Sequence, residues 1–223
     1  MSPTLPRLAG RDENLPALRA AGSELLDVLH ALHRKGRNVV TELMFPRTSL
    51  GEWEHLPADD VLDPGTGFRY YYHAHPDSVA KREHGHFHLF QRVSGTDGKP
   101  AFTHLAGVSV NAAGLPLRAF TTNRWVTDEV MQPAAAVGAM LDRFDVRTPR
   151  RLELVHRWLG AVTRLFRPQL DWLLEQRDQR IARELPRRPN LFEDRRTELL
   201  SECALDLGRQ FARLEHATAP ARG

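Results

Sequence analysis

The spacing of apolar residues along this chain changes twice, and each change marks a different kind of secondary structure. In the first part, residues 14–35 carry apolar side chains three, four and seven positions apart, which is the spacing of an amphipathic helix. Asn14 is suited to cap the first turn of this helix and Gly36 to end it. The pattern therefore predicts one N-terminal helix, preceded by a disordered arm over residues 1–13.

Between residues 67 and 124 the spacing becomes an alternation of two, which is the period of a β-strand. Short segments rich in glycine, asparagine and aspartate join the alternating stretches, and such connections join antiparallel neighbours. Residues 48–67 contain several prolines, glycines and aspartates and are predicted to form a loop. The sequence thus predicts a four-stranded antiparallel meander, with strands at residues 68–75, 84–93, 101–110 and 117–123.

The last third, residues 128–216, returns to helical spacing. Helices are expected over residues 128–144, 149–184 and 191–216, and Pro168 should kink or split the second. The predicted fold class is therefore α+β: a four-stranded antiparallel meander sheet packed by an N-terminal helix and a C-terminal set of long helices. A single domain is expected over residues 14–216, followed by a loose tail at residues 217–223.

The composition is that of an ordinary globular domain, with 223 residues, 41% hydrophobic and 26% charged. No apolar run approaches the roughly 18 residues that would suggest a membrane span, and no signal peptide is apparent. The single cysteine, Cys203, excludes an internal disulfide and fits a reducing compartment. We therefore expect a cytoplasmic protein without membrane contact.

Arginine supplies nearly all of the positive charge, because Lys35, Lys81 and Lys99 are the only lysines. Arginine suits phosphate groups, but here it is interleaved with acidic residues and forms no long basic block. The sequence therefore does not favour nucleic acid as a partner. The length of the predicted C-terminal helices favours a homodimer formed through them.

Histidines carry the main chemical signal, since six of the 11 lie between residues 73 and 104. Side chains two positions apart on a strand project from the same face, so His84, His86 and His88 would form a row. If residue 93 pairs with residue 101 and His73 pairs with His86, the histidines of three strands share this face. The same register would place Ala106, Val108 and Val110 beside them, so a pocket covered by helices is expected. The six histidines are His73, His75, His84, His86, His88 and His104.

Imidazole is the commonest protein ligand for metal ions, and three imidazoles with an open position describe a catalytic zinc site. We predict His86, His88 and His104 as ligands of a divalent metal ion, with zinc or iron favoured. A small-molecule substrate would bind beside it. The other candidates are His84, His73 and Tyr71 as catalytic or proton-shuttling groups, and Arg124 and His75 as substrate-binding groups.

Four segments resemble an uncharacterised bacterial protein family of unknown function. They are residues 71–75, residues 83–90 with the motif EHGHFHLF, residues 103–105, and residues 121–126 with the motif TTNRW. The resemblance spans most of the chain from about residue 20. It implies no activity, but it marks the histidine strands as the signature of the family.

The sequence favours a metal-dependent enzyme acting on a small molecule at a histidine-lined pocket of the sheet. Two alternatives stay open: a non-catalytic metal-binding or metal-handling protein, and a helical interaction module whose histidines are structural. An open coordination position would favour the enzyme, a closed four-ligand site the second reading, and a metal-free protein the third.

Overall fold

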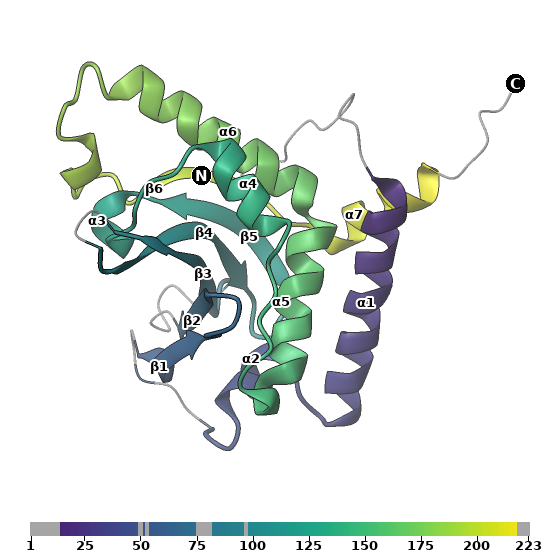
Figure 1. Ribbon diagram of the computed structural model, residues 1–223. Coiled ribbons are helices and arrows are strands. Elements are labelled where there is room, and N and C mark those ends of the chain that lie inside the picture. Colours follow the sequence, from purple (N-terminus) through teal and green to yellow (C-terminus); the bar gives the residue numbers. More distant parts are fainter. Residues whose placement is uncertain (1–13, 49–50, 52–53, 75–81, 96–97, 218–223) are drawn as a thin grey trace, which may run out of the picture.

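The computed structural model describes residues 14–48, 51, 54–74, 82–95 and 98–217. The predicted arm at residues 1–13, and all but the first residue of the predicted tail, lie outside this range. A six-stranded antiparallel sheet forms the centre of the fold, and each strand pairs with the next along the chain (Figure 1). The strands are β1 (His55–Leu62), β2 (Phe68–Ala74), β3 (Gly85–Ser94), β4 (Pro100–Val110), β5 (Pro116–Thr122) and β6 (Leu199–Ala204).

The prediction of four strands was wrong, although the four predicted strands are present with each end within one residue. Strand β1 was not predicted, because Pro57 and two aspartates are typical of loops. As the edge of the sheet, β1 tolerates a proline that donates no ladder hydrogen bond. Strand β6 was not predicted either, because Leu199, Cys203 and Leu207 are spaced four apart, as on a helix.

The helices are also distributed differently from the prediction, which placed the long ones at the C-terminal end. The longest described helix, of 20 residues, is the N-terminal one, and Asn14 caps it as expected. Pro168 does separate two helices, whereas the predicted helix at residues 191–216 is divided by β6. The helices are α1 (Leu15–Arg34), α2 (Val39–Met44), α3 (Arg124–Thr127), α4 (Ala134–Leu141), α5 (Glu153–Leu165), α6 (Arg167–Glu184) and α7 (Leu207–His216), with 3₁₀ turns at Arg150–Leu152 and Leu191–Glu193.

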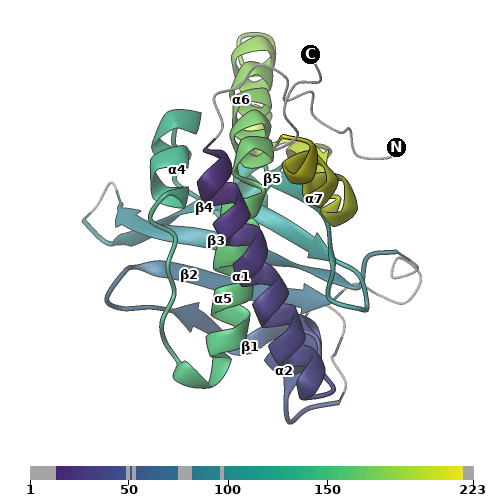
Figure 2. The ribbon, with the colours of Figure 1, turned by 90° about the vertical axis from the view of Figure 1, so that its right-hand side faces the viewer.

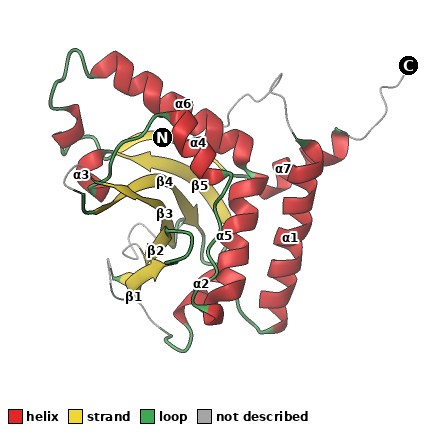
Figure 3. Ribbon diagram, in the orientation of Figure 1, coloured by secondary structure: helices red, strands yellow, loops and turns green. Residues whose placement is uncertain are grey.

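The large helices gather on one face of the sheet. Figure 2 shows α1 and α5 in front of the strands, and Figure 3 shows the same arrangement from the side. Trp158 of α5 is fully buried, and its ring centroid lies 5.6 Å from that of Phe87 on β3. Helix α1 packs in turn against α5, so the apolar core lies between these helices and one sheet face. Within the described residues, no helix has the length and apolarity needed to cross a bilayer.

The pairing of β3 with β4 contains one β-bulge, and this bulge decides which residues share a face. Phe90 pairs with His104 as predicted, but the neighbouring Leu89 pairs with Ala106. Leu105 is therefore an extra residue on β4, without a partner in the ladder. An extra residue reverses the side to which every later side chain of the strand points.

The expected composition of the histidine face was therefore wrong. Ala106, Val108 and Val110 lie in the apolar core beneath the helices, because the bulge turns them away from the histidines. In their place, Gly107 pairs with His88, and Ser109 with His86. These three apolar residues of β4 thus face the helices. They are no evidence that helices also cover the histidine face, as was expected.

Candidate metal centre

Three histidines from β2 and β3 converge on the sheet face opposite the large helices. His73 pairs with His86, as predicted, and the centroids of their rings lie 4.2 Å apart. His88 follows two residues later, with its ring centroid 4.7 Å from that of His86 and 5.5 Å from that of His73. One ring nitrogen from each histidine lies within 4.8 Å of one from each of the others. Because zinc–nitrogen bonds are about 2.0–2.1 Å long, modest side-chain rotations would bring all three onto one ion.

The three histidines differ in their exposure to solvent. His86 and His88 are buried, with 7% and 2% of their surface exposed, whereas His73 is half-buried. Burial, reinforced by the neighbouring imidazoles, lowers the pKa of His88 well below its usual value. His88 is therefore neutral near pH 7, which is the form of imidazole that binds a metal.

The proton of His86 is fixed by Glu83. Nδ1 of His86 lies 3.0 Å from Oε1 of Glu83, and Oε2 of Glu83 accepts a hydrogen bond from Nε of Arg118 at 3.0 Å. An ionised carboxylate only accepts hydrogen bonds, so Nδ1 of His86 must be the donor. The lone pair of His86 is then on Nε2. Metal-binding histidines characteristically donate their other nitrogen to a carboxylate in this way.

His88 is held by a chain of buried polar groups. Its Nδ1 lies 3.1 Å from Nε2 of His104, and Nδ1 of His104 lies 3.1 Å from Oγ1 of Thr122. The hydroxyl of Thr122 is 3.2 Å from that of Thr127, which donates to Glu129 at 3.4 Å. If each group donates its proton to the next group in the chain, ending at Glu129, then Nδ1 of His88 carries a proton. The lone pair of His88 would then be on Nε2. His104, which was predicted as a ligand, thus lies behind His88 and outside the converging set.

Glu129 closes this chain in a buried position. Its Oε2 accepts a hydrogen bond from the backbone nitrogen of His104 at 3.1 Å, and only 5% of the residue is exposed. Burial raises the pKa of Glu129 to about 7, although the charge of Arg177 and the hydrogen bonds act in the opposite direction. The chain of hydrogen bonds thus ends at a carboxyl group that changes charge near neutral pH.

An aromatic ring from β5 packs against the histidines, and a glycine makes room for it. His88, Gly107 and Phe120 are paired across β3, β4 and β5. The ring of Phe120 lies 4.9 Å from that of His86 and 5.6 Å from that of His88, between centroids. A Cβ atom on Gly107 would come within 2.2 Å of the Phe120 ring. Gly107 is therefore required for this contact.

His55 and Asp60 were not among the predicted site residues, because β1 was not predicted as a strand. His55 pairs with His73 and stacks on Tyr71, with ring centroids 4.0 Å apart. Its Nδ1 lies 3.0 Å from Oδ1 of Asp60, whose other oxygen accepts a hydrogen bond from Nε of Arg69 at 2.9 Å. Asp60 has a φ of 54°, a conformation that costs free energy in residues other than glycine. This backbone conformation occurs where the register of β1 shifts.

Two of the other predicted site residues lie away from the converging histidines. His84 precedes β3, and its Nδ1 lies 2.6 Å from the hydroxyl of Tyr72, a residue of the helix-covered face. Gly85 allows this approach, since a Cβ there would lie 2.4 Å from the same hydroxyl. Arg124 forms an ion pair with Glu193 instead of facing the histidines.

Tyr71 does lie within the cluster, with its ring centroid 5.0 Å from that of His88. Burial raises the pKa of Tyr71 to about 12, so its hydroxyl stays protonated at neutral pH. His75, the remaining predicted site residue, lies outside the described residues.

The TTNRW motif has a mainly structural role. Asn123 is fully buried, and its amide nitrogen donates to the carbonyl oxygens of Leu191 and Thr197 at 2.8 and 2.9 Å. The indole nitrogen of Trp125 donates to the carbonyl of Thr197 as well, at 2.9 Å. The motif therefore ties the end of β5 to the segment that leads into β6, and Thr122 connects it to the histidine chain.

Fold and site together describe a helix-backed antiparallel sheet whose opposite face carries a cluster of histidines. The chain belongs to the family described as Domain of unknown function (DUF6969), whose model matches residues 19–205. This match confirms the predicted likeness to a family of unknown function. No curated protein and no solved structure matches the chain significantly.

The contact between Gly107 and Phe120 yields a stability prediction. Gly107→Ala should lower the free energy of unfolding by about 1–3 kcal/mol, because the added methyl group collides with a buried ring. Gly208→Ala is the control, since a Cβ there would meet its nearest neighbour at 3.4 Å. Urea unfolding followed by circular dichroism measures both variants. An equal loss in both, or no loss in Gly107→Ala, would show that the ring does not occupy this position.

The raised pKa of Glu129 predicts a pH dependence. Between about pH 4.5 and 7 the carboxyl group of Glu129 is protonated in the native state and ionised in the unfolded chain. The contribution of this group to the free energy of unfolding is therefore lost as pH rises through this range. The unfolding free energy of wild type minus that of Glu129→Gln should therefore fall across this range, by up to about 3 kcal/mol. The measurement is urea unfolding of chelator-treated protein at several pH values. Glu198→Gln, on an exposed side chain, is the control, and a rising difference for Glu129→Gln would contradict the assignment.

Proposed function

We propose that this protein is a metal-dependent enzyme in which His73, His86 and His88 hold one divalent metal ion. The observation that carries the proposal is the approach of one nitrogen from each of these rings to within 4.8 Å of the others. Two paired strands supply the three rings, so the sheet fixes their separation before any ion binds. Such preorganisation is what a precise metal site requires.

The hydrogen bonds behind the rings support the same proposal. Glu83 fixes the Nδ1 proton of His86, and Nδ1 of His88 lies 3.1 Å from Nε2 of His104, which can accept its proton. Both rings can then offer Nε2 to an ion. Such outer partners orient metal ligands and raise their basicity, and their loss typically lowers metal affinity by about 10–100-fold.

Zinc is the ion that this ligand set favours. Three neutral imidazoles are a common zinc set, whereas non-haem iron enzymes typically use two histidines and a carboxylate. Both oxygens of the neighbouring Glu83 are already engaged, by His86 and Arg118. Three protein ligands leave a fourth position for water, and zinc lowers the pKa of such a water to about 7. The reaction class we propose is therefore metal-assisted attack of water on a small molecule.

His55 is the group we propose for moving protons to and from this centre. Asp60 accepts a hydrogen bond from Nδ1 of His55, which leaves the basic lone pair on Nε2. Its side chain is 41% exposed, so it can exchange protons with solvent. It also lies beside His73, with ring centroids 6.1 Å apart. A solvent-exposed histidine with a fixed tautomer suits general acid–base catalysis.

Metal analysis of protein purified without a histidine tag tests the ligand assignment. We expect about one zinc ion per chain in the wild type. His73→Ala, His86→Ala and His88→Ala should each lose more than about 100-fold in zinc affinity, which is the most that loss of an outer hydrogen-bond partner typically costs. His84→Ala is the matched control, because it removes a histidine of the same run that faces Tyr72 instead. Circular dichroism verifies that each variant is folded. Folded triad variants that keep their zinc, or a wild type that binds none, would refute the assignment.

Cobalt substitution tests whether the site is catalytic. An open fourth position would let azide bind the cobalt ion and change its visible absorption spectrum, with no comparable change in apo protein. A spectrum that azide does not alter would indicate a closed site, and would favour the non-catalytic metal-binding reading.

A further inference from the structure

A second site candidate lies on the helix-covered side of the sheet, away from the histidine centre. It is a cavity of about 310 Å³ between α5, α1 and the connection from α4 to α5. Figure 2 shows this connection running alongside α5 and α1. The volume is at the small end of the range for ligand pockets, about 300–1,000 Å³. A ligand of this cavity would therefore be small.

The charged groups around the cavity leave an excess of positive charge. Arg157 pairs with Glu24 at 2.6 Å, and Arg147 pairs with Asp145 at 2.6 Å. Two further arginines, Arg150 and Arg164, line the cavity. Within the described part of the chain, their side chains form no ion pair or hydrogen bond. Four arginines and three acidic residues line the cavity: Arg147, Arg150, Arg157 and Arg164, with Glu24, Asp145 and Glu153.

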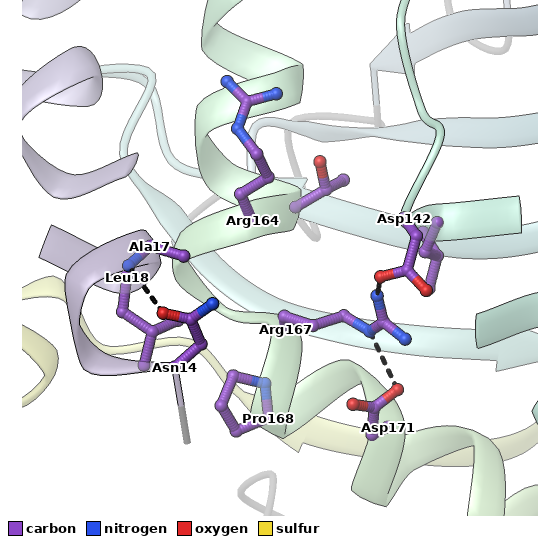
Figure 4. Close-up of a pocket in the computed structure, with 10 residues that line it drawn as sticks. Asn14, Ala17, Leu18, Asp142, Arg164, Arg167, Pro168 and Asp171 are labelled. Atoms are coloured by element: carbon purple, nitrogen blue, oxygen red, sulfur yellow. Dashed lines mark hydrogen bonds and ion pairs between the residues drawn. The ribbon is translucent and has the colours of Figure 1, made fainter. Parts of the chain in front are cut away.

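Arg164 is placed where it can turn towards a ligand. Figure 4 draws a neighbouring pocket, which Arg164 also lines. The guanidinium group of Arg164 is joined to none of the residues drawn there, whereas Arg167 is hydrogen-bonded to Asp142 and Asp171. Gly160, one turn earlier on α5, leaves room for the Arg164 side chain. A Cβ at Gly160 would lie 3.0 Å from a guanidinium nitrogen of Arg164.

His156 in the cavity wall is the second observation that points to a ligand. The residue is buried, with 6% of its surface exposed, and neither ring nitrogen has a hydrogen-bond partner. Most buried polar groups in proteins are hydrogen-bonded, so an exception of this kind calls for a missing partner. Burial lowers the pKa of His156 to about 4, and the ring is therefore neutral near pH 7, with one donor and one acceptor.

We propose that this cavity binds the oxyanion group, phosphate or carboxylate, of a small molecule. Arg150 and Arg164 would supply charge-assisted hydrogen bonds, and His156 would supply a neutral donor. The planar guanidinium group matches the geometry of both phosphate and carboxylate, so the two arginines select for an oxyanion but not for one of the two kinds. This site does not depend on the proposed metal centre, because it lies on the other face of the sheet and shares no residue with it.

Calorimetric titration at low ionic strength with inorganic phosphate, and separately with succinate, tests this proposal. At least one probe should saturate a single site, and the tighter one identifies the source of the oxyanion. Arg150→Gln combined with Arg164→Gln should weaken binding by about tenfold or more, since two charge-assisted bonds are lost. Arg143→Gln, on an exposed residue of the same connection, is the matched control and should bind within about twofold of the wild type.

The imidazole resonances of His156 provide a second readout. They should shift when the probe binds to the wild type, and at the same probe concentration they should shift much less in the double variant. The proposal is overturned if neither probe binds, if Arg143→Gln weakens binding as much as the double variant does, or if saturating probe leaves the His156 resonances unchanged.

Discussion

The β-bulge at Leu105 is the constraint on which the two faces of this sheet depend. Before the bulge, His104 lies on the same face as His88, and after it Ala106, Val108 and Val110 lie under the helices. One unpaired residue thus lets a single strand contribute a polar group to the histidine chain and apolar groups to the core. Gly107 follows on the histidine face, where its missing side chain admits the ring of Phe120.

The polar groups behind the histidines give the candidate centre its chemical character. Glu83 holds His86 and defines its tautomer, and the chain from His104 to Glu129 holds His88 in position. Buried polar groups of this kind are costly unless they are paired. Their nearly complete pairing indicates that the arrangement is a built feature of the fold.

Alternation in the sequence was sufficient to predict β2 to β5, the pairing of His73 with His86, and the face shared by His88 and His104. It could not predict β1, because an edge strand tolerates Pro57, or β6, whose apolar residues have helical spacing. Nothing local marks the bulge at Leu105, because its position is set by packing against β3. The ligand set proposed from sequence included His104, which shares the face of His88 but lies behind it, whereas the structure brings His73 to the other two. His55 was not predicted as a site residue, because it lies on β1.

The central claim is that three imidazoles from two adjacent strands bind one metal ion. X-ray absorption spectroscopy of the zinc-loaded protein tests this claim most directly. The account predicts scattering from three imidazole rings at zinc–nitrogen distances of about 2.0–2.1 Å, with one further oxygen ligand. A spectrum that fits fewer than three imidazoles, or that requires sulfur or an all-oxygen shell, would contradict it.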